Sequence, residues 1–172
     1  MKKSKAARMM KETRVRSGKT QQQLAVDMFQ SREYISKQEC GKRKIPQVST
    51  KYFVEKYNNP WLALEAVNEY VGWGISRLDG PAAQKDNLHL QILLEDGLQR
   101  AIKVLGNVNL TAKLNDMNSI KIDDVRKSAE IMTSVIHFST LYLATVCEDY
   151  EINWQKLWKD HHQTLYSKRL LN

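Results

Sequence analysis

The stretch TQQQLAVDMFQSREYISKQECGKRKIP, residues 20–46, decides the fold of the N-terminal part of the chain. Its few apolar residues recur at helical spacing, and residues that start or end helices stand between them. Thr20 and Gln23 can form a capping box, in which each side chain satisfies a free amide of the first turn. Ser31 can cap a second helix, and Gly41 stands where a left-handed terminator is needed. The stretch therefore predicts two short helices joined by a tight turn.

Apolar spacing and chain breakers extend this prediction in both directions. No segment shows sustained alternation of apolar and polar residues, so no significant sheet is expected and the fold class is all-α. Short helices are expected first, and long amphipathic helices after them. The expected helices lie at about 5–16, 20–28, 31–40, 46–58, 60–71, 86–106, 123–149 and 153–170, with a possible short one at 110–118.

Glycine and proline gather between the short and the long helices, within residues 72–87. This composition is typical of a linker. We therefore expect three parts: a small basic domain with an N-terminal arm at 1–71, a linker at 72–86, and a helical bundle that mediates oligomerisation at 87–172.

Positive charge is concentrated at one end of the chain. Residues 1–50 hold 13 Lys/Arg against 4 Asp/Glu, a net charge of +9, whereas the whole chain carries +8. Such a module suggests a polyanionic partner, either nucleic acid or an anionic membrane surface. No apolar run reaches the ~18–20 residues that span a bilayer, and the start lacks the apolar core of a signal peptide. The expected location is cytoplasmic, with Cys40 and Cys147 as free thiols.

Two short helices, the second with polar and basic side chains, meet the requirements of major-groove reading. Matching elements stand in register over about residues 6–70. They are Gly18, Thr20-Gln21, Leu24-Ala25, Ser31-Arg32, Ile35-Ser36, Glu39, Gly41-Lys42-Arg43 and Pro46. On these elements the segment resembles the Cro/CI-like, or XRE-type, helix-turn-helix DNA-binding domains. The resemblance implies a five-helix DNA-binding domain.

The resemblance also implies roles for single residues. Arg32, Glu33 and Lys37 would look into the groove, where Arg32 or Lys37 suits guanine and Glu33 can accept from cytosine N4. Gln21 would contact phosphate and buttress the second helix, and Tyr34 or Ser36 would add a backbone or thymine-methyl contact. The loop cations would hold the sugar–phosphate backbone. The implied DNA-binding residues are Gln21, Ser31, Arg32, Glu33, Tyr34, Ser36, Lys37, Lys42, Arg43 and Lys44.

An internal ion pair between Arg14 and Glu39 is implied as well. The chain departs from the family pattern at three positions. Phe29 stands where a turn glycine is common, Lys19 where an apolar residue precedes the capping Thr20, and Gln38 at a core position. We expect Phe29 to fill the gap in a small core together with Val15, Leu24 and Ile35.

Other candidate sites are weaker. The basic start, with Lys2, Lys3, Lys5 and Arg8, is either an arm on DNA or a solubilising tail. His161 and His162 are adjacent and point to different faces of a helix, so a metal site is not expected. Two acidic pairs faintly resemble those of acidic helical nucleotide pyrophosphatases, but no nucleophile–base set or phosphate loop accompanies them. These pairs are Glu95-Asp96 and Glu148-Asp149.

We therefore expect a sequence-specific, DNA-binding transcriptional regulator, a repressor of the phage or plasmid type, without enzymatic activity, metal or cofactor. Its expected partners are double-stranded DNA and further copies of itself as a dimer or tetramer, with an antirepressor protein as a further candidate, but no membrane. A stripe at Ile131, Val135 and Phe138 is expected to face a second subunit. Two alternatives stay open: an antitoxin-like or partner-sequestering protein with a DNA-binding leader, and a small helical enzyme with such a leader.

Overall fold

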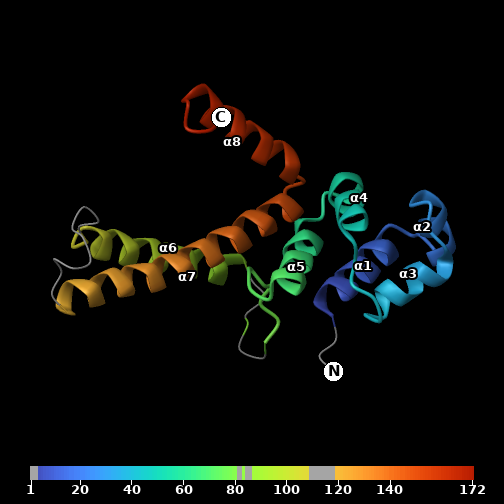
Figure 1. Cartoon of the computed structure of the whole chain (residues 1–172), viewed down its shortest axis with the longest axis horizontal. Helices are drawn as coiled ribbons and strands as arrows, with labels where there is room; N and C mark the ends of the chain where they lie inside the picture. The colour runs from blue at the N-terminus through green and yellow to red at the C-terminus, as the bar shows by residue number, and fades with distance from the viewer. Residues whose placement is uncertain (1–3, 81–82, 84–86, 109–118) are drawn as a thin grey trace. The chain divides into compact units, whose positions relative to one another are not determined.

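The computed structural model describes residues 4–80, 83, 87–108 and 119–172 (Figure 1). Within these residues the protein is all-α, with eight helices and no strand. The helices are α1 (Lys5–Arg16), α2 (Gln21–Asp27), α3 (Arg32–Glu39), α4 (Gln47–Tyr57), α5 (Pro60–Val71), α6 (Asn87–Leu105), α7 (Ser119–Asp149) and α8 (Trp154–Ser167).

The all-α class and the change from short to long helices are confirmed. Each expected helix is found, with ends that differ by a few residues. The short helix expected at 110–118 lies outside the described residues, as do Lys2 and Lys3 of the basic start.

The chain divides into two compact units. One unit comprises Met1–Arg77 together with Val146–Asn172, and the other comprises Leu78–Thr145. The functional division expected from the sequence, at 1–71, 72–86 and 87–172, rests on composition and stays a prediction.

In the first unit, α1 packs on α5 and α3, α2 packs on α3, and α4 packs on α5. The caps explain where these helices begin. Ser4, Thr20, Ser31 and Asn59 each accept a hydrogen bond from a free amide of the first turn of the helix that follows. The fully buried core side chains include Met10, Leu24, Ile35, Ile45, Phe53 and Leu62.

Two side chains expected in this core lie outside it. Phe29 is 97% exposed and Val15 is 59% exposed, whereas Leu24 and Ile35 are fully buried as expected. The reason at Phe29 is its backbone. Its φ of 52° is left-handed, which provides the sharp turn that a glycine more often makes and directs the ring into solvent. The expectation that Phe29 fills the core is therefore wrong.

The beginning of the expected linker is held against α5. Glu65 is almost fully buried, and its carboxylate accepts from the Ser76 hydroxyl at 3.1 Å and from the Arg77 amide at 2.9 Å. The Arg77 guanidinium lies 4.7 Å from the centroid of the Trp61 ring. These contacts extend the ordered structure of the first unit to residue 77.

The end of α7 and the segment before α8 join the first unit by hydrogen bonds. Glu148 accepts from Arg16 Nη1 at 2.6 Å and from Trp61 Nε1 at 2.8 Å. Asn58 donates to the Ile152 carbonyl and accepts from the Trp154 amide, both at 2.8 Å. Residues more than 85 positions apart in sequence are thus fixed to one another.

The second unit contains α6 and most of α7. Gly97 and Ala101 are the buried residues of α6, and a Cβ added to Gly97 would lie 3.5 Å from Val135 Cγ2. Val135 is therefore buried inside the pair, so the expectation that it faces a second subunit is wrong. The exposed large apolar residues of α6 and α7 are Leu88, Ile92, Leu98, Ile102, Leu105, Ile120, Ile136 and Tyr142.

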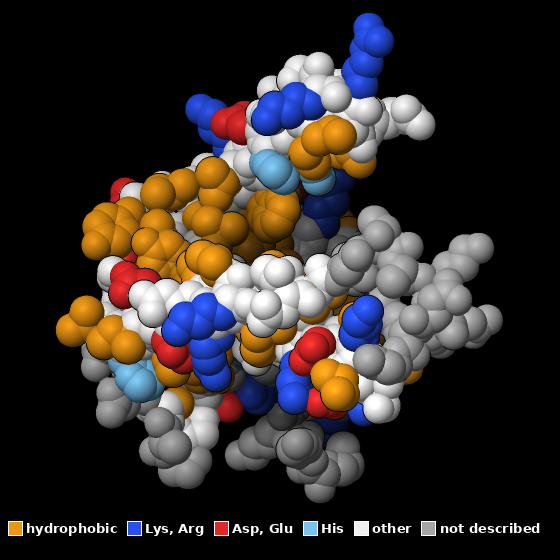
Figure 2. All heavy atoms as spheres, turned by 90° about the vertical axis from the view of Figure 1, so that its left-hand side faces the viewer, with side chains coloured by type: hydrophobic (Ala, Val, Ile, Leu, Met, Phe, Trp, Pro, Cys, Tyr) orange, Lys and Arg blue, Asp and Glu red, His pale blue; other side chains and the backbone are white. Residues whose placement is uncertain are grey.

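Hydrophobic side chains also reach the surface on the side of the molecule that Figure 2 shows. Among the described residues, α7 is the helix long and apolar enough to cross a membrane by length and composition alone. Only 22% of its most apolar window is buried. One such helix is weak evidence for a membrane span, and six of the ten residues from Lys121 to Glu130, near the start of α7, are charged.

Candidate nucleic-acid interface

Reciprocal capping fixes the start of α2. The Thr20 hydroxyl accepts from the Gln23 amide at 3.1 Å, and Gln23 Oε1 accepts from the Thr20 amide at 2.9 Å. This is the capping box expected from the sequence. Leu24 and Ala25, the buried residues of the helix, then face α3. The first helix of the pair is therefore held at a defined angle.

A tight turn directs α3 away from α2. The Gln30 amide donates to the Ala25 carbonyl at 2.9 Å, and Phe29 supplies the left-handed residue. The Ser31 hydroxyl then accepts from the Tyr34 amide at 3.1 Å and caps α3. The Ser31 hydroxyl is used in this cap. In the structure Ser31 therefore positions α3, whereas the sequence analysis expected it to contact DNA.

The two faces of α3 differ sharply. Ile35, Gln38 and Glu39 are buried, whereas Arg32, Glu33 and Lys37 are exposed and Ser36 and Tyr34 are half-buried. Positions 32 and 36 are four residues apart, as are positions 33 and 37, so each pair lies on one side of the helix. The structure thus brings together Arg32, Glu33 and Lys37, the three side chains expected to look into the groove, with Ser36 beside them.

A buried charge network anchors the inner face of α3. Glu39 Oε1 accepts from Arg14 Nε at 2.5 Å, and Glu39 Oε2 accepts from Arg14 Nη2 at 3.0 Å. Gln21 Nε2 also donates to Glu39 Oε2, at 2.8 Å. The Glu39 side chain is 1% exposed and that of Arg14 is 11% exposed. The hydrogen bond to Glu39 raises the pKa of Arg14 despite its burial.

The expected Arg14–Glu39 pair is therefore present, and Gln21 contacts α3 as expected of a buttress. Arg14 also donates to the Lys19 carbonyl at 2.7 Å, which fixes the chain just before α2. The Lys19 ammonium forms an ion pair with Asp27 at the other end of α2. Lys19 thus contacts α2 through an ion pair, at a position where the family carries an apolar residue.

On the outer face, Lys37 Nζ lies 2.6 Å from Glu33 Oε1. The hydrogen bond from Lys37 lowers the pKa of the Glu33 carboxyl. An exposed pair of this kind contributes little to stability, because solvent screens it. Its main effect here is to hold two candidate base-reading groups side by side.

The cationic loop follows directly after α3. The Lys42 and Arg43 amides both donate to the Lys37 carbonyl, at 2.9 and 3.2 Å. The Arg43 guanidinium lies 4.7 Å from the centroid of the Tyr34 ring. Lys44 differs, because its ammonium donates to the Glu69 carbonyl of α5 at 2.9 Å. Lys42 and Arg43 are thus placed beside α3, and Lys44 is occupied at the end of α5.

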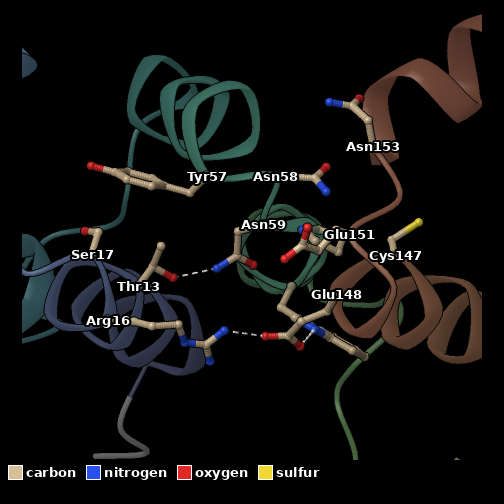
Figure 3. Close-up of a pocket in the computed structure, with 12 residues that line it drawn as sticks. Thr13, Arg16, Ser17, Tyr57, Asn58, Asn59, Cys147, Glu148, Glu151 and Asn153 are labelled. Carbon is tan, nitrogen blue, oxygen red and sulfur yellow. Dashed lines mark hydrogen bonds and ion pairs between the residues drawn. The ribbon is translucent and has the colours of Figure 1, made fainter.

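A pocket of about 480 Å³ lies where residues 147–153 meet α1 and the α4–α5 junction (Figure 3). No sequence motif indicated it. Its polar side chains largely bond to one another: Asn59 donates to the Thr13 hydroxyl at 2.5 Å, and Glu148 binds Arg16 and Trp61. The described residues contain no group of three His, Cys, Asp or Glu side chains placed to hold a metal ion. The pocket therefore lies between packed segments of the first unit, and hydrogen bonds within the protein occupy most of its polar groups.

Comparison with known proteins gives no relative: no protein-family model, no curated protein and no solved structure matches this chain. The functional argument therefore rests on the residues and the geometry described above.

Proposed function

We propose that the protein is a sequence-specific DNA-binding regulator in which α2 and α3 form a helix-turn-helix and α3 reads the major groove. In this proposal residues 6–70 are an XRE-type domain. The observation that carries it is the asymmetry of α3. Its inner face is fixed by the buried Glu39 network, and its outer face presents Arg32, Glu33, Ser36 and Lys37.

The chemistry of the outer face fits the edges of a G·C pair. A guanidinium or ammonium donates to guanine N7 and O6, and a carboxylate accepts from cytosine N4. Lys37 and Glu33 lie side by side, so in this proposal they read the two bases of one pair or of neighbouring pairs. Binding must then exchange their mutual contact for contacts with the bases.

Lys42 and Arg43 lie next to this face and are exposed. They support a contact with phosphate, which positions a recognition helix without reading sequence. Residues 1–50 carry the excess positive charge. This charge favours association with the DNA backbone whatever the base sequence.

We further propose that the protein binds a palindromic operator as a dimer or tetramer. One helix-turn-helix contacts a single half-site, and two-fold assemblies place two recognition helices in successive grooves. The exposed apolar residues of α6 and α7 support self-association, because α6 has apolar side chains well outside the face that packs on α7. Repression is the expected outcome at such an operator.

The test compares two lysines on DNA selected by the purified protein. Lys37→Ala should weaken binding to the selected operator by about 1–3 kcal/mol and relax base choice at one position per half-site. Lys51→Ala is the matched control, because Lys51 is also exposed and also pairs with a glutamate four residues away, at 3.8 Å. Equal losses on the operator and on random DNA would contradict base reading by Lys37.

The alternative is an antitoxin-like protein that sequesters a partner and carries a DNA-binding leader. The same exposed apolar residues on α6 and α7 favour it if they are not consumed by self-association. Light scattering separates the two proposals. A stable dimer or tetramer supports the regulator, whereas a monomer with this surface free supports the partner-binding protein.

A further inference from the structure

The last helix that the structure describes, α8, is largely exposed to solvent. None of the 14 residues of α8 is buried. Its start is nevertheless well fixed, because Asn153 accepts from the Lys156 amide at 2.8 Å and the Trp154 amide donates to Asn58. The capped start and the absence of buried side chains indicate a formed helix whose surface is available.

The surface of α8 is divided into two faces. Trp154, Leu157, Trp158, His161 and Leu165 recur every three or four residues and form one face. Its rings contact one another: Trp154 and Trp158 lie 5.8 Å apart, and Trp158 and His161 lie 6.1 Å apart.

The opposite face carries Lys156, Lys159 and Gln163. Lys168 and Arg169 follow directly after the helix, and Leu170 and Leu171 follow them. An amphipathic helix with Trp and Leu on one side and Lys on the other is the type that lies in a membrane interface.

Charge and size favour a membrane over a second copy of α8 as the surface that covers the apolar face. Residues 154–172 contain four Lys/Arg against one Asp, a net charge of +3, so two copies would bring like charges together. A helix of this length extends only about 21 Å, and one side of it falls short of the ~800 Å² per partner of a standard interface. An anionic bilayer complements this positive charge. Binding to it requires only apolar side chains that enter the interface and lysines that face the headgroups.

We propose that α8 docks on an anionic membrane surface, with Trp154, Leu157, Trp158 and Leu165 entering the interface and the lysines facing lipid headgroups. The indole side chain has an apolar body and one polar N–H, which suits this boundary. The helix lies on the surface and does not span the bilayer. The inference is independent of the DNA-binding proposal, because it uses residues outside α2 and α3.

The experiment uses the full chain and vesicles made of equal parts phosphatidylglycerol and phosphatidylcholine, with co-sedimentation as the readout. Trp158→Gln should weaken binding by about tenfold, from the loss of apolar area. Lys159→Gln should weaken it by about fivefold, from the loss of one charge near the surface. Vesicles of phosphatidylcholine alone should bind much less.

Trp73→Gln is the matched control, because Trp73 is more exposed than Trp158, at 75% against 40%, and lies outside α8. It should leave vesicle binding unchanged, and circular dichroism should show that both variants remain folded. Leu157→Gln provides a second test of the same face.

Three results would overturn the proposal. The first is no binding to anionic vesicles. The second is equal loss on Trp73→Gln and Trp158→Gln, which would show that the lipid contact is not specific to α8. The third is a drop in molecular mass of Trp158→Gln without lipid, which would show that α8 contacts a second copy.

Discussion

Replacing Gln38 by methionine should stabilise the first unit. Gln38 is fully buried in α3, and neither its Oε1 nor its Nε2 has a hydrogen-bond partner. A buried amide without partners costs about 1–3 kcal/mol in measured proteins. Methionine has a similar shape and a similar helix propensity, so it removes this cost without leaving a cavity.

The expected gain in unfolding free energy is therefore about 1–3 kcal/mol. Urea unfolding followed by circular dichroism measures it, with the midpoint rising and the slope unchanged. Gln22→Met is the control, because Gln22 is an exposed glutamine of α2 and lacks the buried amide. Operator binding should be retained, since Gln38 lies on the inner face of α3.

An unchanged or lower midpoint for Gln38→Met would refute this reasoning, because it would mean that the amide is satisfied in solution or that its shape is required. A gain of the same size in Gln22→Met would refute it too, since that gain would come from helix propensity.

Four further predictions follow from the same contacts. Phe29→Gly should stabilise the protein by about 1 kcal/mol, because glycine adopts the left-handed φ freely and the exposed ring loses no packing; a lower urea midpoint would contradict this. Glu39→Gln should destabilise it by about 3–5 kcal/mol, because Arg14 keeps a half-buried, unpaired charge; a change below 1 kcal/mol by the same assay would refute the anchoring role. Lys42→Ala should weaken binding to all DNA sequences and reduce the salt slope by about one, and an unchanged slope would exclude a phosphate contact. Burial alone would raise the pKa of Glu148, but hydrogen bonds from Arg16 and Trp61 lower it overall. Its stabilising effect is therefore present above its unfolded pKa and lost as the pH falls through its folded pKa. In Glu148→Gln the free energy of unfolding should therefore fall less steeply as the pH is lowered.

Local sequence signals predicted the helices well. The caps at Thr20 and Ser31 and the terminator at Gly41 act on amides within a few residues, so they can be recognised without tertiary information. The outer face of α3 could be predicted for the same reason, because helical spacing alone decides which residues share a side.

Features that depend on distant residues could not be predicted. Nothing near Glu148 in the sequence indicates that Arg16 and Trp61 will bind it. The exposed position of Phe29 does not follow from its hydrophobicity, because it depends on the left-handed backbone that the turn requires. Apolar spacing does not distinguish packing within a helix pair from packing between subunits, so it predicts an interface at Val135, which packs against α6 instead.

Footprinting of full-length protein on DNA selected from its own genome tests the central claim most directly. The account predicts two protected half-sites of related sequence, about 34–36 Å or a multiple of that apart on one face of the duplex. It also predicts that Lys37→Ala loses discrimination at one base pair in each half-site, while Lys51→Ala does not. Selection that yields no common sequence, or protection that both variants leave unchanged, would contradict the claim that α3 reads DNA.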